Sequence, residues 1–251
     1  AQNPQRTHRR DRMHQDSAQS RLPGPPRDLH HPLRPAKHHP LSARGHTLSV
    51  LPCTTDLGNV QRKLAVQKPD CVFNLVETLD GSGRLIHLAP ATWEVAGLPF
   101  TGSSSEALYL TTHKLLSKER MLAAGLPVPE WVLRETGNAQ HSTLNTQRST
   151  QKADWIVKSV WEHASIGLGD DSLVRGATAA EVSARVPPGS FAERFVEGRE
   201  FNLALLAGPD GPEVLPPAEI VFEDYPDGKP RIVSYQAKWD EASFEYAHTV
   251  R

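Results

Sequence analysis

WIVKSVWEHASIGLGDD (residues 155–171) is the most informative stretch of this sequence. Its apolar start has the length of a β-strand and carries Lys158, where a partly buried ammonium is costly unless an anion meets it. A loop of small residues that includes Gly167 follows, so one cation and several backbone N–H groups stand together, which suits a phosphate group. A surface lysine before an ordinary hairpin turn explains the pattern about equally well, because the glycine spacing of a Walker-type loop is absent.

A second stretch with nucleotide-binding chemistry is FAERFVEGREFNLALL, residues 191–206. The alternation of side chains along a strand predicts that Glu193 and Phe195 lie on one face, and Gly198 allows a tight turn before Glu200 enters the next strand. Carboxylates beside an aromatic ring can accept hydrogen bonds from an adenine amino group and from ribose hydroxyls. A solvated hairpin whose glutamates face water is the competing interpretation, and the residues alone favour it.

A third stretch, SYQAKWDEASFEY (residues 234–246), interleaves aromatic and charged side chains around Lys238. It fits a lid over a charged ligand, and it fits an amphipathic edge strand with its loop equally well. Composition does not distinguish the two.

Hydrophobic periodicity predicts two regions of different architecture. From position 41 to position 125, helices at 56–70, 87–97 and 104–125 alternate with strands at 48–51 and 71–77, as in a parallel α/β unit. After a polar stretch at 135–151, strands are expected at 155–160, 191–196, 200–208, 214–223 and 232–239, with one helix at 178–186. The close spacing of these strands is typical of an antiparallel α+β domain, so the predicted fold class is α/β followed by α+β.

The first 46 of the 251 residues differ in composition from the rest. Nine Arg and Lys against three Asp give this stretch a charge of +6, and since the whole chain sums to −1, the remainder carries −7. The stretch also holds seven of the 21 prolines and seven of the 12 histidines, and it buries too little apolar area to offset the ordering entropy. We expect residues 1–40 to form a disordered tail. A nucleic-acid arm is disfavoured because the stretch has no aromatic side chains and the acidic remainder repels phosphate backbones.

The two cysteines and the hydropathy of the sequence exclude several further classes of protein. Cys53 and Cys71 have no Cys or His partners at metal-ligand spacing, so we expect two buried, reduced thiols rather than a disulfide or a zinc site. No run approaches the roughly 18 apolar residues of a membrane helix, and the basic N-terminus lacks the apolar core of a signal peptide. A cytoplasmic protein without membrane contact is the expectation.

Together these stretches, in this order, resemble the ATP-grasp superfamily and, within it, its D-alanine:D-alanine ligase-like branch. The resemblance covers most of the chain from about position 41 and depends on four parts. They are PDCVFNLVE (69–77) followed by AGLPFTGSSSEALYLTTHKLLSKERMLAAGLPVPEW (96–131), IVKSVWEHASIGL (156–168), FAERFVEGREFNLALL (191–206), and LPPAEIVFE (215–223) followed by SYQAKWDEASFEY (234–246). The combination is far more specific than any one part.

The resemblance implies an ATP-grasp fold with a partial pre-ATP-grasp α/β domain at 41–110 and an ATP-grasp domain at 111–251, which would comprise the central subdomain and the start of the C-terminal one. It implies an ATP-dependent ligase that joins a small carboxylate to an amine through an acyl phosphate, with ATP and Mg²⁺ as cofactors and a homodimer as the usual assembly. The alternative is a catalytically silent nucleotide-binding module.

The resemblance also assigns roles to individual residues. Lys114 on the helix 104–125 and Lys158 match the two ATP-contacting lysines of the family, and Lys238 lies on the loop that covers the active site. The remaining matches are Glu162 and Ser165 in the phosphate loop, Glu193 with the backbone of Phe195 and Val196 at the adenine, Glu200 at the ribose and, more weakly, Glu77 at the substrate.

Some family features have no counterpart in this sequence. His113, His163 and Ala164 stand where related sequences usually have an Asp before the lysine and a Gly/Ser-rich loop. The family's Glu-x-Asn pattern of magnesium ligands is absent, so these ligands are expected beyond Arg251, and this chain alone is expected to form no amide.

Overall fold

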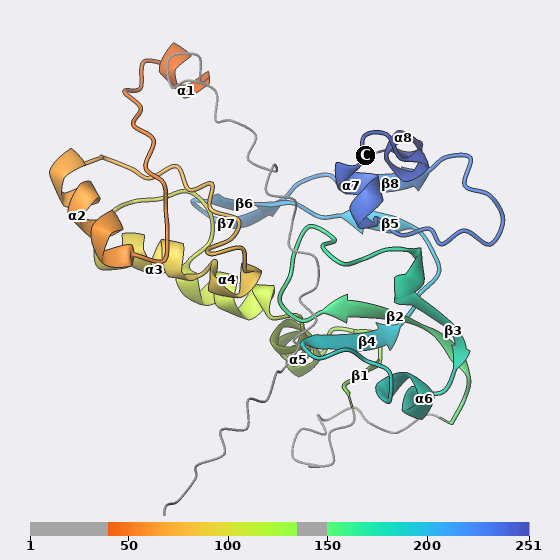
Figure 1. Cartoon of the computed structure of the whole chain (residues 1–251). Coiled ribbons are helices and arrows are strands. Elements are labelled where there is room, and N and C mark those ends of the chain that lie inside the picture. Colours follow the sequence, from red (N-terminus) through yellow and green to blue (C-terminus); the bar gives the residue numbers. More distant parts are fainter. Residues whose placement is uncertain (1–39, 135–149, 251) are drawn as a thin grey trace, which may run out of the picture.

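The computed structural model describes residues 40–134 and 150–250. Figure 1 shows a helical N-terminal part in orange to yellow, a central sheet in green to teal, and a C-terminal part of small sheets and short helices in blue. The expected tail at 1–40 and the polar stretch at 135–151 lie almost wholly outside the described residues. The described chain mixes helices with antiparallel sheets and is therefore α+β.

Short helices make up most of the N-terminal part. They are α1 (Pro40–Ala43), α2 (Leu57–Gln67), the 3-10 turn η2 (Gly83–Leu85), α3 (Leu88–Val95), α4 (Ser105–Thr112) and α5 (Lys114–Ala123). The side chain of Asp56 caps α2 by accepting a hydrogen bond from the Asn59 N–H, as the sequence predicts. The buried face of α2 packs against Ala89 and Trp93 of α3, which forms the small core of this part.

The parallel α/β unit predicted for this region is not formed among the described residues. The predicted strand at 48–51 is irregular chain, and the one at 71–77 contributes a single parallel bridge, between Val72 and Phe100. Phe73 and Leu75 are about half exposed rather than covered on both faces. An apolar run becomes a strand only where neighbouring strands take up its backbone groups along its length, and among the described residues the pairing of this run is one bridge. Cys71 is exposed too, contrary to expectation, while Cys53 is half-buried, and burial raises the pKa of the Cys53 thiol.

The single helix predicted at 104–125 is two helices, because the backbone of His113 leaves the helical region at φ −79° and ψ 96°. His113 follows the last residue of α4 and caps α5, since its Nδ1 accepts a hydrogen bond from the Leu116 N–H at 3.1 Å. Lys114 therefore begins a helix instead of lying within one.

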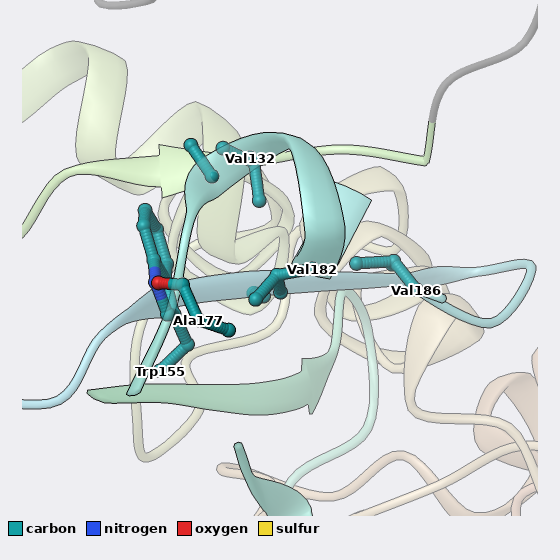
Figure 2. Close-up of a cluster of buried hydrophobic side chains, with 7 residues drawn as sticks. Val132, Trp155, Ala177, Val182 and Val186 are labelled. Atoms are coloured by element: carbon teal, nitrogen blue, oxygen red, sulfur yellow. The ribbon is translucent and has the colours of Figure 1, made fainter. Parts of the chain in front are cut away.

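The central sheet has four antiparallel strands in the order β1-β4-β2-β3. They are β1 (Trp131–Val132), β2 (Ala153–Ser159), β3 (Leu173–Ala177) and β4 (Ser190–Arg194), with the 3-10 turn η4 (Asp170–Ser172) before β3 and the helix α6 (Ala179–Ser183) after it. Val182 of α6 packs with Trp155, Ala177 and Val186 in the largest buried cluster (Figure 2). A second cluster holds Trp131, Val160 and Phe191 under the apolar side chains of α5. The sheet is thus covered by one helix on each face.

The C-terminal part is antiparallel, as predicted. The strands β5 (Glu200–Asn202), β8 (Ala218–Phe222) and β9 (Thr249–Val250) form one sheet, and β6 (Leu205–Gly208) pairs with β7 (Gly211–Val214) in a hairpin. Two predictions are wrong here. The run 200–208 is divided into β5 and β6, and the predicted strand at 232–239 contains the helix α7 (Tyr235–Trp239), which α8 (Phe244–His248) follows. Ser234 explains the helix, because its hydroxyl caps α7 by accepting from the Ala237 N–H.

Among the helices described, none has the length and apolar character to cross a membrane.

Candidate functional site

The two lysines that the sequence assigns to ATP lie close together at one end of the central sheet. Lys158 extends from β2, while Lys114 opens α5 and its Nζ donates to the main-chain carbonyl of Glu162 at 2.5 Å. The backbone N–H of Lys114 also donates to the Val160 carbonyl at 3.1 Å. Burial, helped by the charge of Lys158, lowers the pKa of Lys114 to about 8. A cation that burial and a neighbouring cation destabilise in this way forms a position suited to an anion.

Glu193 forms ion pairs with Lys158 and with a third lysine, Lys118. Its Oε1 lies 2.6 Å from the Nζ of Lys158, and its Oε2 lies 2.6 Å from the Nζ of Lys118 on α5. The register explains the first contact, because Glu193 faces Ile156 across the ladder and so shares its side of the sheet with Lys158. Burial favours the neutral acid, but the two lysines outweigh it and hold the pKa of Glu193 below its ordinary value.

Lys118 is the residue of the candidate site that the sequence interpretation missed. It is buried on α5, four positions after Lys114, so helical spacing places both side chains on one side of the helix. That spacing was the available signal, although lysines at i and i+4 are also common on solvent-exposed helix faces.

The loop after β2 is fixed by hydrogen bonds from its own main chain. The Ser159 hydroxyl accepts from the N–H groups of Trp161 and Glu162 at 3.3 and 3.1 Å. Ala164 and Ser165 follow in the left-handed region, at φ 54° and 60°, which turns the chain sharply. This turn is a strained conformation for residues that carry a Cβ, within the loop of small residues that the sequence indicates.

The helix that carries Lys238 packs against this loop. The hydroxyl of Ser165 donates to the Val233 carbonyl at 2.6 Å, and the indole N–H of Trp239 donates to the Ala164 carbonyl at 2.8 Å. The N–H of Tyr235 donates to the Leu168 carbonyl at 2.8 Å. The structure thus brings the predicted phosphate loop and the predicted covering segment together, with Lys238 half-buried on α7.

The residues predicted to bind the adenine and the ribose do not all line one groove. Phe195 is half-buried, and its N–H donates to the Asp154 carbonyl at 2.9 Å. It lines an open groove of about 580 Å³ between the end of the central sheet and β8. Val196 is 70% exposed, and Glu200 is exposed on β5 opposite Ile220. Neither of these two residues lines the groove.

The residues that the structure describes form no magnesium site made of protein ligands alone. Over 40–134 and 150–250 there is no group of three or more His, Cys, Asp or Glu side chains that could hold a metal ion. Glu219, a carboxylate near the groove, has both oxygens 2.7 Å from nitrogens of Arg199. Glu77, the weak substrate candidate, is exposed on irregular chain.

No protein-family model matches the chain. Among curated proteins, an uncharacterized protein y4sG from Sinorhizobium fredii is 31% identical over 173 residues, which are 67% of this chain and 47% of that protein. The D-alanine–D-alanine ligase of Coprothermobacter proteolyticus is 28% identical over 83% of this chain and 65% of its own length. That of Chromohalobacter salexigens is 32% identical over 71% and 52%. The chain spans about half to two thirds of the length of these relatives.

Solved structures of the same kind match at lower identity. An L-amino acid ligase from Bacillus licheniformis aligns with a TM-score of 0.46 at 21% identity, over 69% of this chain and 39% of that one. A D-alanyl-alanine synthetase A from Vibrio cholerae aligns with a TM-score of 0.42 at 17% identity, over 64% and 46%. The sequence relatives support the resemblance that the motifs indicated: over the part that they match, this chain is similar to D-alanine–D-alanine ligases.

Proposed function

We propose that the chain binds ATP at the lysine pair of β2 and α5 and serves an ATP-dependent ligase that joins a carboxylate to an amine. The observation that carries the proposal is the meeting of two cations from separate elements at the end of β2, where the Lys114 N–H donates to the Val160 carbonyl and burial, helped by the charge of Lys158, lowers the pKa of Lys114. The names of the curated relatives, D-alanine–D-alanine ligases, support the reaction type.

Each candidate residue has a role in this proposal. Lys114 and Lys158 bind phosphate oxygens, and the loop with Glu162 and Ser165 approaches the phosphates through its backbone N–H groups. Lys238 supplies a further cation from α7. The adenine edge is bound by the backbone of Phe195 and Val196, next to Glu193, whose two carboxylate oxygens are held by Lys158 and Lys118. Glu200 accepts from the ribose hydroxyls.

The proposed reaction has two steps. A substrate carboxylate oxygen attacks the γ-phosphorus of ATP, the bond to the β,γ-bridging oxygen breaks, and ADP leaves an acyl phosphate behind. The amine nitrogen of the second substrate then attacks the acyl carbon, inorganic phosphate leaves, and the nitrogen loses a proton to give the amide. The lysines lower the barrier of the first step by holding the phosphates in line and by offsetting the negative charge on their oxygens.

Magnesium would accompany the nucleotide, and the charge compensation that we propose from the described residues of this chain is that of its lysines. D-Alanine pairs are the substrates named for the relatives, and for this chain they are the first pair to test.

Thermal unfolding with and without Mg-ATP tests the nucleotide site. Lys158→Ala should abolish the ATP-induced rise in melting temperature, whereas Lys63→Ala, an exposed lysine on α2, should leave it unchanged. An unchanged rise in Lys158→Ala would remove this lysine from the site.

Release of ADP and phosphate in the presence of D-alanine tests the reaction. Turnover that requires both ATP and an amino acid supports the ligase. ATP binding without any release of phosphate is the outcome expected both of a nucleotide-binding module without catalysis and of a ligase whose magnesium ligands lie outside the described residues.

A further inference from the structure

Lys118 is a buried lysine on the helix that covers the sheet. It is 6% exposed, and it is the buried residue of α5. An ammonium removed from water to this extent destabilises the fold unless an anion compensates it. The compensating group is Glu193, whose Oε2 lies 2.6 Å away, so α5 is joined to β4 by a buried ion pair.

The Glu193 carboxylate is shared between two lysines. Lys158 contacts Oε1 and Lys118 contacts Oε2, both at 2.6 Å. The three side chains together carry one net positive charge. Without Lys118, the remaining pair would be neutral, and the whole charge of Lys158 would be offset by Glu193.

The two lysines differ in access to a ligand. The Lys158 side chain is 32% exposed, whereas that of Lys118 is 7% exposed. The Lys118 ammonium lies 5.4 Å from the ring centre of Trp131 and 6.0 Å from that of Phe191, which screen it from solvent. A phosphate can therefore meet Lys158 but not Lys118.

We propose that Lys118 is a positioning residue of the nucleotide site. It compensates Glu193 and fixes the orientation of that carboxylate, so that Lys158 keeps its charge available for a phosphate group. This inference rests on the proposed function, in which Lys158 binds ATP.

The test compares ATP affinities by isothermal titration calorimetry of the whole chain with Mg-ATP. Lys118→Met keeps the length of the side chain without its charge and should weaken ATP binding about tenfold. Lys118→Arg keeps the charge and should stay within about threefold of the wild type. The double variant Lys118→Met with Glu193→Gln removes both charges, frees the charge of Lys158 from the carboxylate, and should recover affinity to within about threefold of the wild type.

Recovery in the double variant is the decisive result, because a lysine that only fills space would not be rescued by a change at Glu193. Wild-type affinity in Lys118→Met, or a double variant as weak as Lys118→Met, would overturn the proposal. Circular dichroism monitors folding. If Lys118→Met does not fold, Glu193→Gln alone decides: it should bind ATP about threefold more tightly, and binding no tighter than the wild type's would overturn the proposal. A wild-type chain that does not bind ATP contradicts the proposed function itself, and this role with it.

Discussion

Gly83 of η2 lies so close to His163 of the loop after β2 that a Cβ at this glycine would come within 2.9 Å of the ring Cδ2. The main-chain carbonyl of Trp161 would lie at the same distance. The guanidinium of Arg84 stands 5.4 Å above the Trp161 ring, so two consecutive residues of the N-terminal part contact the phosphate loop. The shape of this loop therefore depends on a segment about 80 positions earlier in the sequence.

Gly83→Ala should destabilise the protein. The added methyl group meets a backbone oxygen that cannot rotate away, so we expect the free energy of unfolding to fall by about 1–3 kcal/mol in urea titrations. Gly58→Ala on α2 is the control, because its nearest neighbour is the end of the Arg62 side chain at 3.6 Å. There the helix should gain up to about 1 kcal/mol. Equal effects of the two substitutions would contradict the close contact at Gly83.

Ala164→Gly should stabilise the protein. Ala164 has a φ of 54°, where a Cβ is unfavourable and glycine is not. After allowance for the greater freedom of glycine in the unfolded chain, we expect a gain of about 0.5–1 kcal/mol in the free energy of unfolding. Ala180→Gly in α6, where the backbone is helical, should lose about 1 kcal/mol. Losses at both positions would show that Ala164 is not strained.

Val182→Ala should remove about 2 kcal/mol from the free energy of unfolding. The side chain is 1% exposed and packs against Trp155, so its loss leaves a cavity that the surrounding core fills only in part. Val66→Ala makes the same chemical change on α2, where the side chain is 83% exposed, and should alter stability by less than about 0.5 kcal/mol. Comparable losses in chemical denaturation would argue against the α6 core as described.

ATP affinity should fall as the pH rises through 8. The pKa of Lys114 is lowered to about 8 by burial and by the charge of Lys158, while Glu162 and Glu193 act in the opposite direction. Lys114 is therefore charged below pH 8 and neutral above it, and the neutral form loses its attraction for phosphate. Calorimetry from pH 7 to pH 9.5 should show a nearly constant dissociation constant at first, and then an increase of up to about tenfold per pH unit.

Lys114→Arg is the control for this pH dependence, because an arginine stays charged over the whole range. Its ATP affinity should not vary between pH 7 and pH 9.5. A constant affinity in the wild type would exclude Lys114 as the titrating group.

Local signals in the sequence predicted the helices better than the strands. Asp56 caps α2 as expected, and Thr178 caps α6 at the start of the helix predicted at 178–186, because a cap depends on residues three positions away. The strand predicted at 71–77 depends on neighbouring strands, which no local pattern supplies. At Ser234 the local signal was overlooked. The apolar run 232–239 was assigned to a strand, although Ser234 within it caps a helix.

The sequence predicted individual residues of the candidate site but not the contacts between them. The motifs indicated Lys114 and Lys158, and the structure places them side by side. Lys118 was missed because a lysine on an amphipathic helix is normally solvated, and only the fold shows that α5 turns it toward Glu193. The roles of these residues in ATP binding remain predictions.

Lys114 is attached to the chain after β2 by its main chain as well as its ammonium, through its N–H to the Val160 carbonyl. The main-chain bond survives any substitution of the side chain except proline. A variant such as Lys114→Ala therefore removes a charge without detaching α5 from the end of β2. Weaker ATP binding in that variant would report the loss of the ammonium, with its charge and its bond to the Glu162 carbonyl, rather than a displaced helix.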